Sequence, residues 1–216
     1  MAVTYPNETK EYRLARDILL KEEVGLRGHI ERVAGLRRGL PDGGLMKESY
    51  KFVDLGGGDV AVADLFSDGK DTLAIYSLMF KPDDQTACPM CVSLLDGLNG
   101  QVAHFGQRMG FAVVAAATPE QLAALAKDRR WDNLRVLSAQ GNRYQADYHA
   151  ESPDGAQQPM INIFRKSPGG ISHFWGSEGL YADIDGHPRH LDQLWPLWNM
   201  LDLTPAGRGS DWYPSL

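Results

Sequence analysis

Apolar side chains recur along this chain at two different spacings, which predict two kinds of secondary structure. In residues 7–40 they recur at three-, four- and seven-residue steps among many charges, which is the pattern of an amphipathic helix. Each glycine inside a helix costs about 1 kcal/mol relative to alanine, so Gly25, Gly28 and Gly35 favour a division into two shorter helices. The Pro-Asp-Gly-Gly sequence at residues 41–44 then ends the helical segment.

Beyond residue 45 the pattern changes to short apolar runs separated by turn-forming residues. Two extended pieces flank a Gly-Gly-Gly-Asp turn and predict a hairpin over residues 50–63. Two runs that are almost free of charge, 72–80 and 111–117, predict strands buried on both faces of a sheet. Further strands are expected at residues 135–138, 159–165 and 171–175, the last two as a hairpin.

Helices are predicted between these strands. An apolar stripe follows a proline over residues 89–105. The Thr-Pro-Glu-Gln sequence at 118–121 offers a capping threonine, a proline for the first helical position and a glutamine to complete a capping box. A last helix is expected over residues 187–201, kinked at Pro196. Because strands and helices alternate, we expect an α/β domain with a mixed sheet flanked by helices.

The change of pattern also sets the expected domains. We expect an N-terminal helical arm over residues 1–45 and an α/β domain over residues 46–216. The apolar face of such an arm needs a cover, and either the domain or a second subunit would provide it. In the second case the chain would form a homodimer.

Composition limits what the chain is expected to do. Of its 216 residues 43% are hydrophobic and 23% are charged, which suffices for one substantial core. The formal net charge of −6 disfavours nucleic acid as a partner. Residues 1–21 lack the apolar core of a secretory signal, and no apolar run approaches the roughly 18 residues that span a bilayer. We therefore expect a cytoplasmic protein without a membrane association.

The candidate chemistry lies in Cys88 and Cys91, the two cysteines of the chain, which form a Cys-Pro-Met-Cys sequence where a buried strand gives way to a helix. The unpaired N–H groups and the dipole at a helix N-terminus favour a thiolate, and can lower the pKa of a cysteine from about 8.5 to roughly 3.5–7.5. In a cytoplasmic protein such a pair is more often catalytic or metal-binding than a structural disulfide. Redox chemistry, metal binding and an inert pair are the three interpretations.

A family resemblance narrows this choice. The sequences VADLFSDGKDTLAIYSLMF, CPMC followed by DGLNG, HFW and NMLDLTPAGRG resemble the DUF899 family of thioredoxin-like proteins, which are usually described as predicted dithiol-disulfide oxidoreductases. The resemblance covers nearly the whole chain, including the arm. It implies a thioredoxin-like fold with Cys88 and Cys91 as the redox centre. In thioredoxin-like proteins a cis-proline faces the cysteines, and Pro159 has the matching position; the sequence leaves its isomer open.

We therefore predict a thiol-disulfide oxidoreductase that acts on a thiol or disulfide substrate, protein or small molecule, without a cofactor or metal. Cys88, at the helix end, would be the attacking thiolate and Cys91 would resolve the mixed disulfide. Pro89, Met90 and Pro159 are assigned to the substrate-binding surface.

Two alternatives stay open. A peroxiredoxin-like thiol peroxidase needs Pro and Thr before its cysteine, and Pro82 and Thr86 come close to that pattern, although Thr86 is one residue too near to Cys88. A non-enzymatic copper-binding protein would use Cys88, Cys91 and a histidine such as His173 as ligands. His173 is expected on the last hairpin strand, which in this fold neighbours the strand of Pro159.

Overall fold

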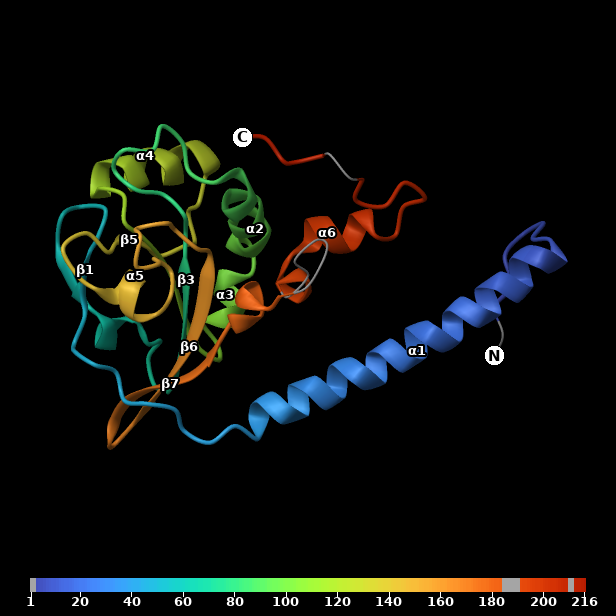
Figure 1. Ribbon diagram of the computed structural model, residues 1–216, viewed down its shortest axis with the longest axis horizontal. Coiled ribbons are helices and arrows are strands. Elements are labelled where there is room, and N and C mark those ends of the chain that lie inside the picture. Colours follow the sequence, from blue (N-terminus) through green and yellow to red (C-terminus); the bar gives the residue numbers. More distant parts are fainter. Residues whose placement is uncertain (1–2, 184–190, 210–211) are drawn as a thin grey trace. The chain divides into compact units, whose positions relative to one another are not determined.

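The computed structural model describes residues 3–183, 191–209 and 212–216. It divides the chain into two compact units, residues 1–41 and 42–216 (Figure 1). In the first unit, α1 (Lys10–Arg38) is one helix of 29 residues, so the division expected at its glycines is wrong. The helix begins at Thr9, whose hydroxyl accepts a hydrogen bond of 3.1 Å from the Tyr12 N–H. The penalty of three glycines is small against a long, well-capped helix rich in Leu, Glu and Arg.

No residue of α1 is buried. Nine of its large apolar side chains are exposed by at least two fifths, and they are Tyr12, Leu14, Ile18, Leu19, Leu20, Val24, Leu26, Ile30 and Leu36. The helix is amphipathic, as its sequence predicted, and its own unit does not bury its apolar side chains.

The second unit is built on a mixed sheet, which in the described part of the chain has seven strands in the order β2-β1-β5-β4-β3-β6-β7. The strands are β1 (Lys51–Val53), β2 (Asp59–Ala61), β3 (Thr72–Ser77), β4 (Gly110–Ala115), β5 (Val136–Ser138), β6 (Met160–Ser167) and β7 (Gly170–Gly176). Strands β3, β4 and β5 are parallel, whereas β6 is antiparallel to β3 and β7 to β6. Both predicted hairpins, β1–β2 and β6–β7, are present.

Alternate residues of the central strands supply two cores, one on each face of the sheet. On β3, Ala74 and Tyr76 join the first core, whereas Leu73 and Ile75 join the second. Helices α2, α4 and α6 cover the first core, and α5 with the β1–β2 hairpin covers the second. All six residues of β4 are buried. The prediction that the uncharged run 111–117 forms a strand covered on both faces is therefore correct.

The helices of this unit are α2 (Pro89–Asn99), α3 (Val102–Phe105), α4 (Pro119–Arg129), α5 (Tyr144–Asp147) and α6 (Pro196–Leu201), with 3₁₀ turns at Val62–Leu65, Glu178–Tyr181 and Asp192–Leu194. The single helix expected over residues 89–105 is wrong, because α2 stops before Gly100 and a separate short helix follows. Pro196 starts α6 and does not kink it. Residues 187–190 of the last predicted helix lie outside the described residues.

Helix α4 starts as the sequence predicted. The Thr118 side chain accepts from the Gln121 N–H at 3.3 Å, and the Thr118 N–H donates to Gln121 Oε1 at 3.0 Å, which closes the capping box. The other atom of the same amide, Gln121 Nε2, donates to the Pro82 carbonyl at 3.0 Å. Helix α4 is thereby tied to the loop that precedes Cys88.

Strand β3, helix α2, the parallel strand β4, and the antiparallel strands β6 and β7 beside β3 together have the connectivity and strand order of a thioredoxin-like domain. The fold class expected from the sequence is therefore confirmed. Among the described residues, no helix has the length and apolar character needed to cross a membrane.

Candidate active site

The two cysteines lie where the loop after β3 meets α2. The backbone N–H of Cys88 donates to the Met79 carbonyl at 3.1 Å, which ties the end of this loop back to its beginning. Cys88 is the residue before the helix and Pro89 is the first helical residue, a position where the missing N–H of proline has no cost. Cys91 follows in the first turn. The spacing of the sequence thus places one sulfur at the helix end and one inside it.

The two thiols differ in exposure and in acidity. Both are free cysteines; Cys88 is partly exposed, whereas Cys91 is 1% exposed. The Cys91 thiol donates to the Cys88 sulfur, and this hydrogen bond is the main cause that lowers the pKa of Cys88 to about 6. Burial opposes the shift, while the N–H groups of Cys91 and Met90 and the hydroxyl of Tyr213 support it. At neutral pH Cys88 is therefore mostly a thiolate.

Cys91 shifts in the opposite direction. The hydrogen bond to Cys88 raises its pKa well above the ordinary value, and burial and the charge of Cys88 raise it further. The two sulfurs share one proton over a wide range of pH, so their titration belongs to the pair. The pair holds one thiolate at the surface and one protonated thiol beneath it.

Two tyrosines accompany the cysteines. The Tyr213 hydroxyl lies 3.7 Å from Cys88 Sγ, although the two residues are 125 positions apart in the sequence. Tyr76, on β3, is 1% exposed, and its hydroxyl makes no hydrogen bond of ordinary geometry with any described residue. Burial and then the charge of Cys91 raise the pKa of Tyr76 well above its ordinary value. Both phenols remain protonated when Cys88 ionises.

Neither tyrosine was placed beside the cysteines by the sequence alone. Tyr76 is part of the first core, and the available signal was its place on the strand that leads to the cysteines, facing the same core as Cys91. Tyr213 carried no signal, because it follows no periodic pattern and belongs to no regular element.

The predicted substrate-binding residues lie near the same edge of the sheet. Pro89 and Met90, between the cysteines, are both partly exposed. Pro159 directly precedes β6, whose first residue, Met160, pairs with Ser77 at the end of β3. No peptide bond in the described residues is cis, so the bond before Pro159 is trans, unlike that of the matching proline in thioredoxin-like proteins.

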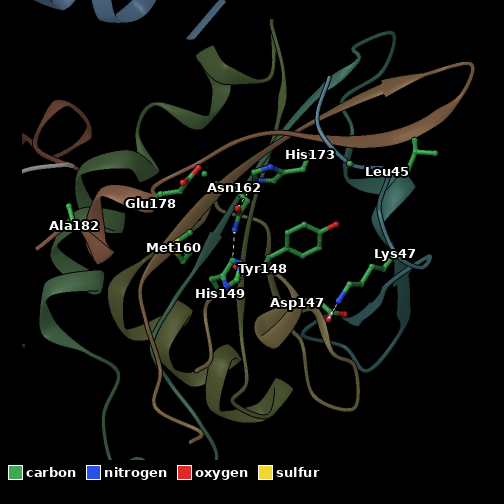
Figure 2. A pocket seen from close by; sticks show the side chains of 12 residues that line it. Leu45, Lys47, Asp147, Tyr148, His149, Met160, Asn162, His173, Glu178 and Ala182 are labelled. Carbon is green, nitrogen blue, oxygen red and sulfur yellow. Dashed lines mark hydrogen bonds and ion pairs between the residues drawn. The ribbon is translucent and has the colours of Figure 1, made fainter. Parts of the chain in front are cut away.

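His173 lies elsewhere. It contributes to a cavity of about 840 Å³ between β6, β7 and the end of α5, where its Nε2 is 2.9 Å from Asn162 Oδ1 and its ring stacks on Tyr148 (Figure 2). The amide N–H of Asn162 donates to the Tyr148 carbonyl at 3.2 Å, which orients the amide so that Oδ1 faces the imidazole. Burial lowers the pKa of His173. Tyr148 packs against the second core, whereas the cysteines belong to the first.

The structure also shows where the residues of the copper-binding and peroxidase alternatives lie. His173 and the cysteine pair lie on opposite faces of the sheet, and no three His, Cys, Asp or Glu side chains of the described residues are arranged to hold a metal ion. The copper ligands Cys88, Cys91 and His173 are thus not brought together. Pro82 and Thr86, the residues of the peroxidase alternative, are both exposed in the loop before Cys88.

Comparison with protein families assigns the chain. A family model described as a bacterial protein of unknown function, DUF899, matches residues 2–216. The chain belongs to the DUF899 family. The matched residues include the helical arm as well as the thioredoxin-like unit, so the family model describes both units of this DUF899 chain. The resemblance inferred from the sequence is therefore confirmed. Comparison with curated proteins found no match.

Several solved structures resemble this DUF899 chain at low identity. Peroxidoxin BcpB from Mycobacterium tuberculosis is 17% identical with a TM-score of 0.46, over 72% of this chain and 94% of its own. A secreted disulfide oxidoreductase from the same organism is 16% identical with a TM-score of 0.41, over 69% and 96%. A peroxiredoxin-like protein from Aquifex aeolicus is 17% identical with a TM-score of 0.44, over 63% and 75%.

Proposed function

We propose that this DUF899 chain is a thiol-disulfide oxidoreductase whose redox centre is Cys88 and Cys91. The observation that supports the proposal is the contrast between the two thiols: a partly exposed sulfur with a pKa of about 6 lies at the start of α2, hydrogen-bonded to a buried thiol whose pKa is well above the ordinary value. An inert structural pair would not need an ionised, accessible member.

The first half of the reaction uses Cys88. Its thiolate attacks one sulfur of a substrate disulfide, forms a Cys88–substrate disulfide and expels the other substrate sulfur as a thiolate. The attack needs no proton transfer, because Cys88 is already ionised near neutral pH. The negative charge moves from the protein to the leaving sulfur.

The second half uses Cys91. Once Cys88 is part of a neutral mixed disulfide, it no longer accepts the hydrogen bond or supplies the charge that raise the pKa of Cys91. Cys91 then loses its proton to the departed substrate thiolate, attacks the Cys88 sulfur and expels the second substrate sulfur as a thiolate. The protein ends with a Cys88–Cys91 disulfide and the substrate with two reduced sulfurs, so two electrons have passed to the substrate. In the opposite direction the same steps oxidise a dithiol.

Trapping distinguishes the roles of the two cysteines. In Cys91→Ser the first step proceeds and the second is blocked, so incubation with oxidised glutathione should leave a stable mixed disulfide on Cys88 in most molecules. Cys88→Ser should form little adduct, because Cys91 is buried and protonated. Intact-protein mass spectrometry measures both. Adducts chiefly on Cys91 would reverse the assignment.

Wild-type protein provides the test of the reaction class. Native, reduced protein should lose two free thiols on mild oxidation and regain both on reduction, with one disulfide formed per chain. Thiols that react only after denaturation would exclude redox activity. Formation of a sulfenic acid at Cys88 with hydrogen peroxide that is faster than any disulfide exchange would favour a peroxidase instead.

A further inference from the structure

Residues 212–216, the end of the chain, bring a phenol to the reactive sulfur. The Tyr213 hydroxyl is 3.7 Å from Cys88 Sγ, within hydrogen-bonding range for sulfur. Among the described residues, Tyr213 provides the hydroxyl that contacts this sulfur, whereas Tyr76 interacts with Cys91. The Tyr213 hydroxyl thus contacts the sulfur of Cys88, the more exposed of the two cysteines.

The contact is supported by a series of interactions that leads back to α2. Trp212 packs edge-to-face on Trp198 of α6, with ring centroids 5.9 Å apart. Trp198 is 2% exposed, and the guanidinium of Arg208 lies 5.3 Å from the centre of its ring. Arg208 in turn donates to the carboxylates of Asp192 at 2.5 Å and Asp202 at 2.7 Å.

Helix α6 is itself fixed to α2. Trp195 Nε1 donates to Ser93 Oγ at 3.3 Å. Pro196 packs closely on Gly97, where an added Cβ would lie 3.2 Å from Pro196 Cδ. Helix α2, which follows Cys88, therefore also anchors, through α6 and Trp198, the ring of Trp212 next to Tyr213.

We propose that Tyr213 is a catalytic residue of this thiol site, and that residues 212–216 form a C-terminal strap whose purpose is to hold its hydroxyl on the Cys88 sulfur. The proposal rests on the thiol-disulfide exchange proposed above and adds a third group to the cysteine pair.

The phenol would act as a hydrogen-bond donor and not as an acid. Burial and then the hydrogen bond to Cys88 raise the pKa of Tyr213, so its proton stays on oxygen wherever the Cys88 thiolate exists. A hydrogen bond to an ionised group is stronger than one to a neutral group. The contact therefore stabilises Cys88 when it carries the charge, which happens before attack and again when Cys88 leaves.

The effect of this hydrogen bond on rate should be largest in the step in which Cys88 leaves the mixed disulfide. When an external thiolate attacks the substrate sulfur of the mixed disulfide, the Cys88–sulfur bond breaks and the electron pair stays on Cys88, where the Tyr213 O–H donates to it. A thiol of lower pKa leaves faster but attacks more slowly as a thiolate. Tyr213→Phe should therefore slow the release of Cys88 while leaving its attack per thiolate unchanged or faster.

The experiment compares wild type, Tyr213→Phe and the matched control Tyr12→Phe, which removes the hydroxyl of an exposed tyrosine on α1. The pH dependence of Cys88 alkylation and of thiolate absorbance near 240 nm gives the apparent pKa of Cys88. Tyr213→Phe should raise it by about 0.5 to 1 unit, and Tyr12→Phe should not change it. A release step slowed at least threefold in Tyr213→Phe would accompany the shift.

A chain that ends at Gly209 gives the second test, because it removes the whole strap. It should reproduce the pKa shift of Tyr213→Phe. If the truncated chain shows the shift and Tyr213→Phe does not, the strap acts by covering Cys88 and the proposal fails. An unchanged pKa in both variants also overturns it. Failure of the exchange reaction itself would appear separately, as wild-type protein that forms no disulfide.

Discussion

Cys88 and Cys91 differ in acidity because the two sulfurs share a single proton. Cys91 donates to Cys88, which lowers the pKa of one and raises that of the other. The helix N-terminus contributes through the N–H groups of Met90 and Cys91. The spacing of the two cysteines therefore places one sulfur before the helix and one inside it. The difference between their pKa values depends on the hydrogen bond between them and on the burial of Cys91, which the spacing does not show.

The share of Cys91 in this activation can be measured. In Cys91→Ala the main cause of the lowered pKa is lost, so the midpoint of Cys88 alkylation by iodoacetamide should move up from about 6 toward the roughly 8.5 of a free thiol. Near pH 6 wild type should react faster than the variant, because more of its Cys88 is ionised, whereas above about pH 9 the variant should react faster, because a thiolate of higher pKa is the better nucleophile. A midpoint that stays near 6 in Cys91→Ala would assign the activation to the helix and to Tyr213 alone.

Residue-scale prediction from the sequence was limited by distance along the chain. The Cys-Pro-Met-Cys spacing and the adjoining strand predicted where both cysteines lie, one before the helix and one in its first turn; their order of attack stays a prediction. Tyr213 could not be found in this way, because its contact with Cys88 depends on the path of α6 and the strap in three dimensions. His173 was expected on the last hairpin strand, and it lies there. Its side chain contacts Phe164 of the second core, on the face of the sheet opposite to the cysteines.

At the scale of elements, local signals that specify a backbone hydrogen bond were the most informative. The Thr-Pro-Glu-Gln sequence predicted the start of α4 because each of its residues has a defined function in a capping box. The apolar stripe after Pro89 predicted where α2 begins but not where it ends, since the stripe continues past Gly100 into α3. Periodicity shows which face is buried, and it does not show where the chain turns.

The cap of α4 provides a stability prediction. Thr118→Ala removes the acceptor of the Gln121 N–H and should lower the free energy of unfolding by about 1 kcal/mol. Thr118→Ser, which keeps the hydroxyl, should lose much less. Urea denaturation of the reduced protein measures both, with unchanged slope and a shifted midpoint. Equal losses in the two variants would show that the methyl group, and not the hydrogen bond, stabilises this site.

On the scale of the whole molecule, alternation of strands and helices was sufficient to predict a mixed sheet with thioredoxin-like connections. It did not predict that β1 pairs with β5, because that pairing joins segments separated in sequence by about half of the domain. The arm was correctly expected to be helical and amphipathic. What covers its apolar side chains cannot be derived from periodicity, which describes one helix at a time.

The exposure of α1 leads us to expect that the chain associates with itself. Leu14 and Ile18 lie one turn apart and are 66% and 65% exposed, and exposed apolar side chains on one helix favour packing against a second copy. At tens of micromolar, sedimentation should show a mass above 23.9 kDa. The double variant Leu14→Lys, Ile18→Lys should sediment as a monomer, whereas Leu203→Lys, at an exposed leucine of the second unit, should not differ from wild type. A monomeric wild type would contradict this expectation.

The amide of Gln121 restricts which sequences can replace it. A capping box accepts either glutamate or glutamine at this position, but here Nε2 also donates to the carbonyl of Pro82. Glutamate would preserve the box and place one acceptor against another. The capping box alone would allow either residue at position 121, but the contact with Pro82 allows only glutamine. We therefore expect glutamine in relatives that retain the loop leading to Cys88, and glutamate only in relatives whose loop follows a different path.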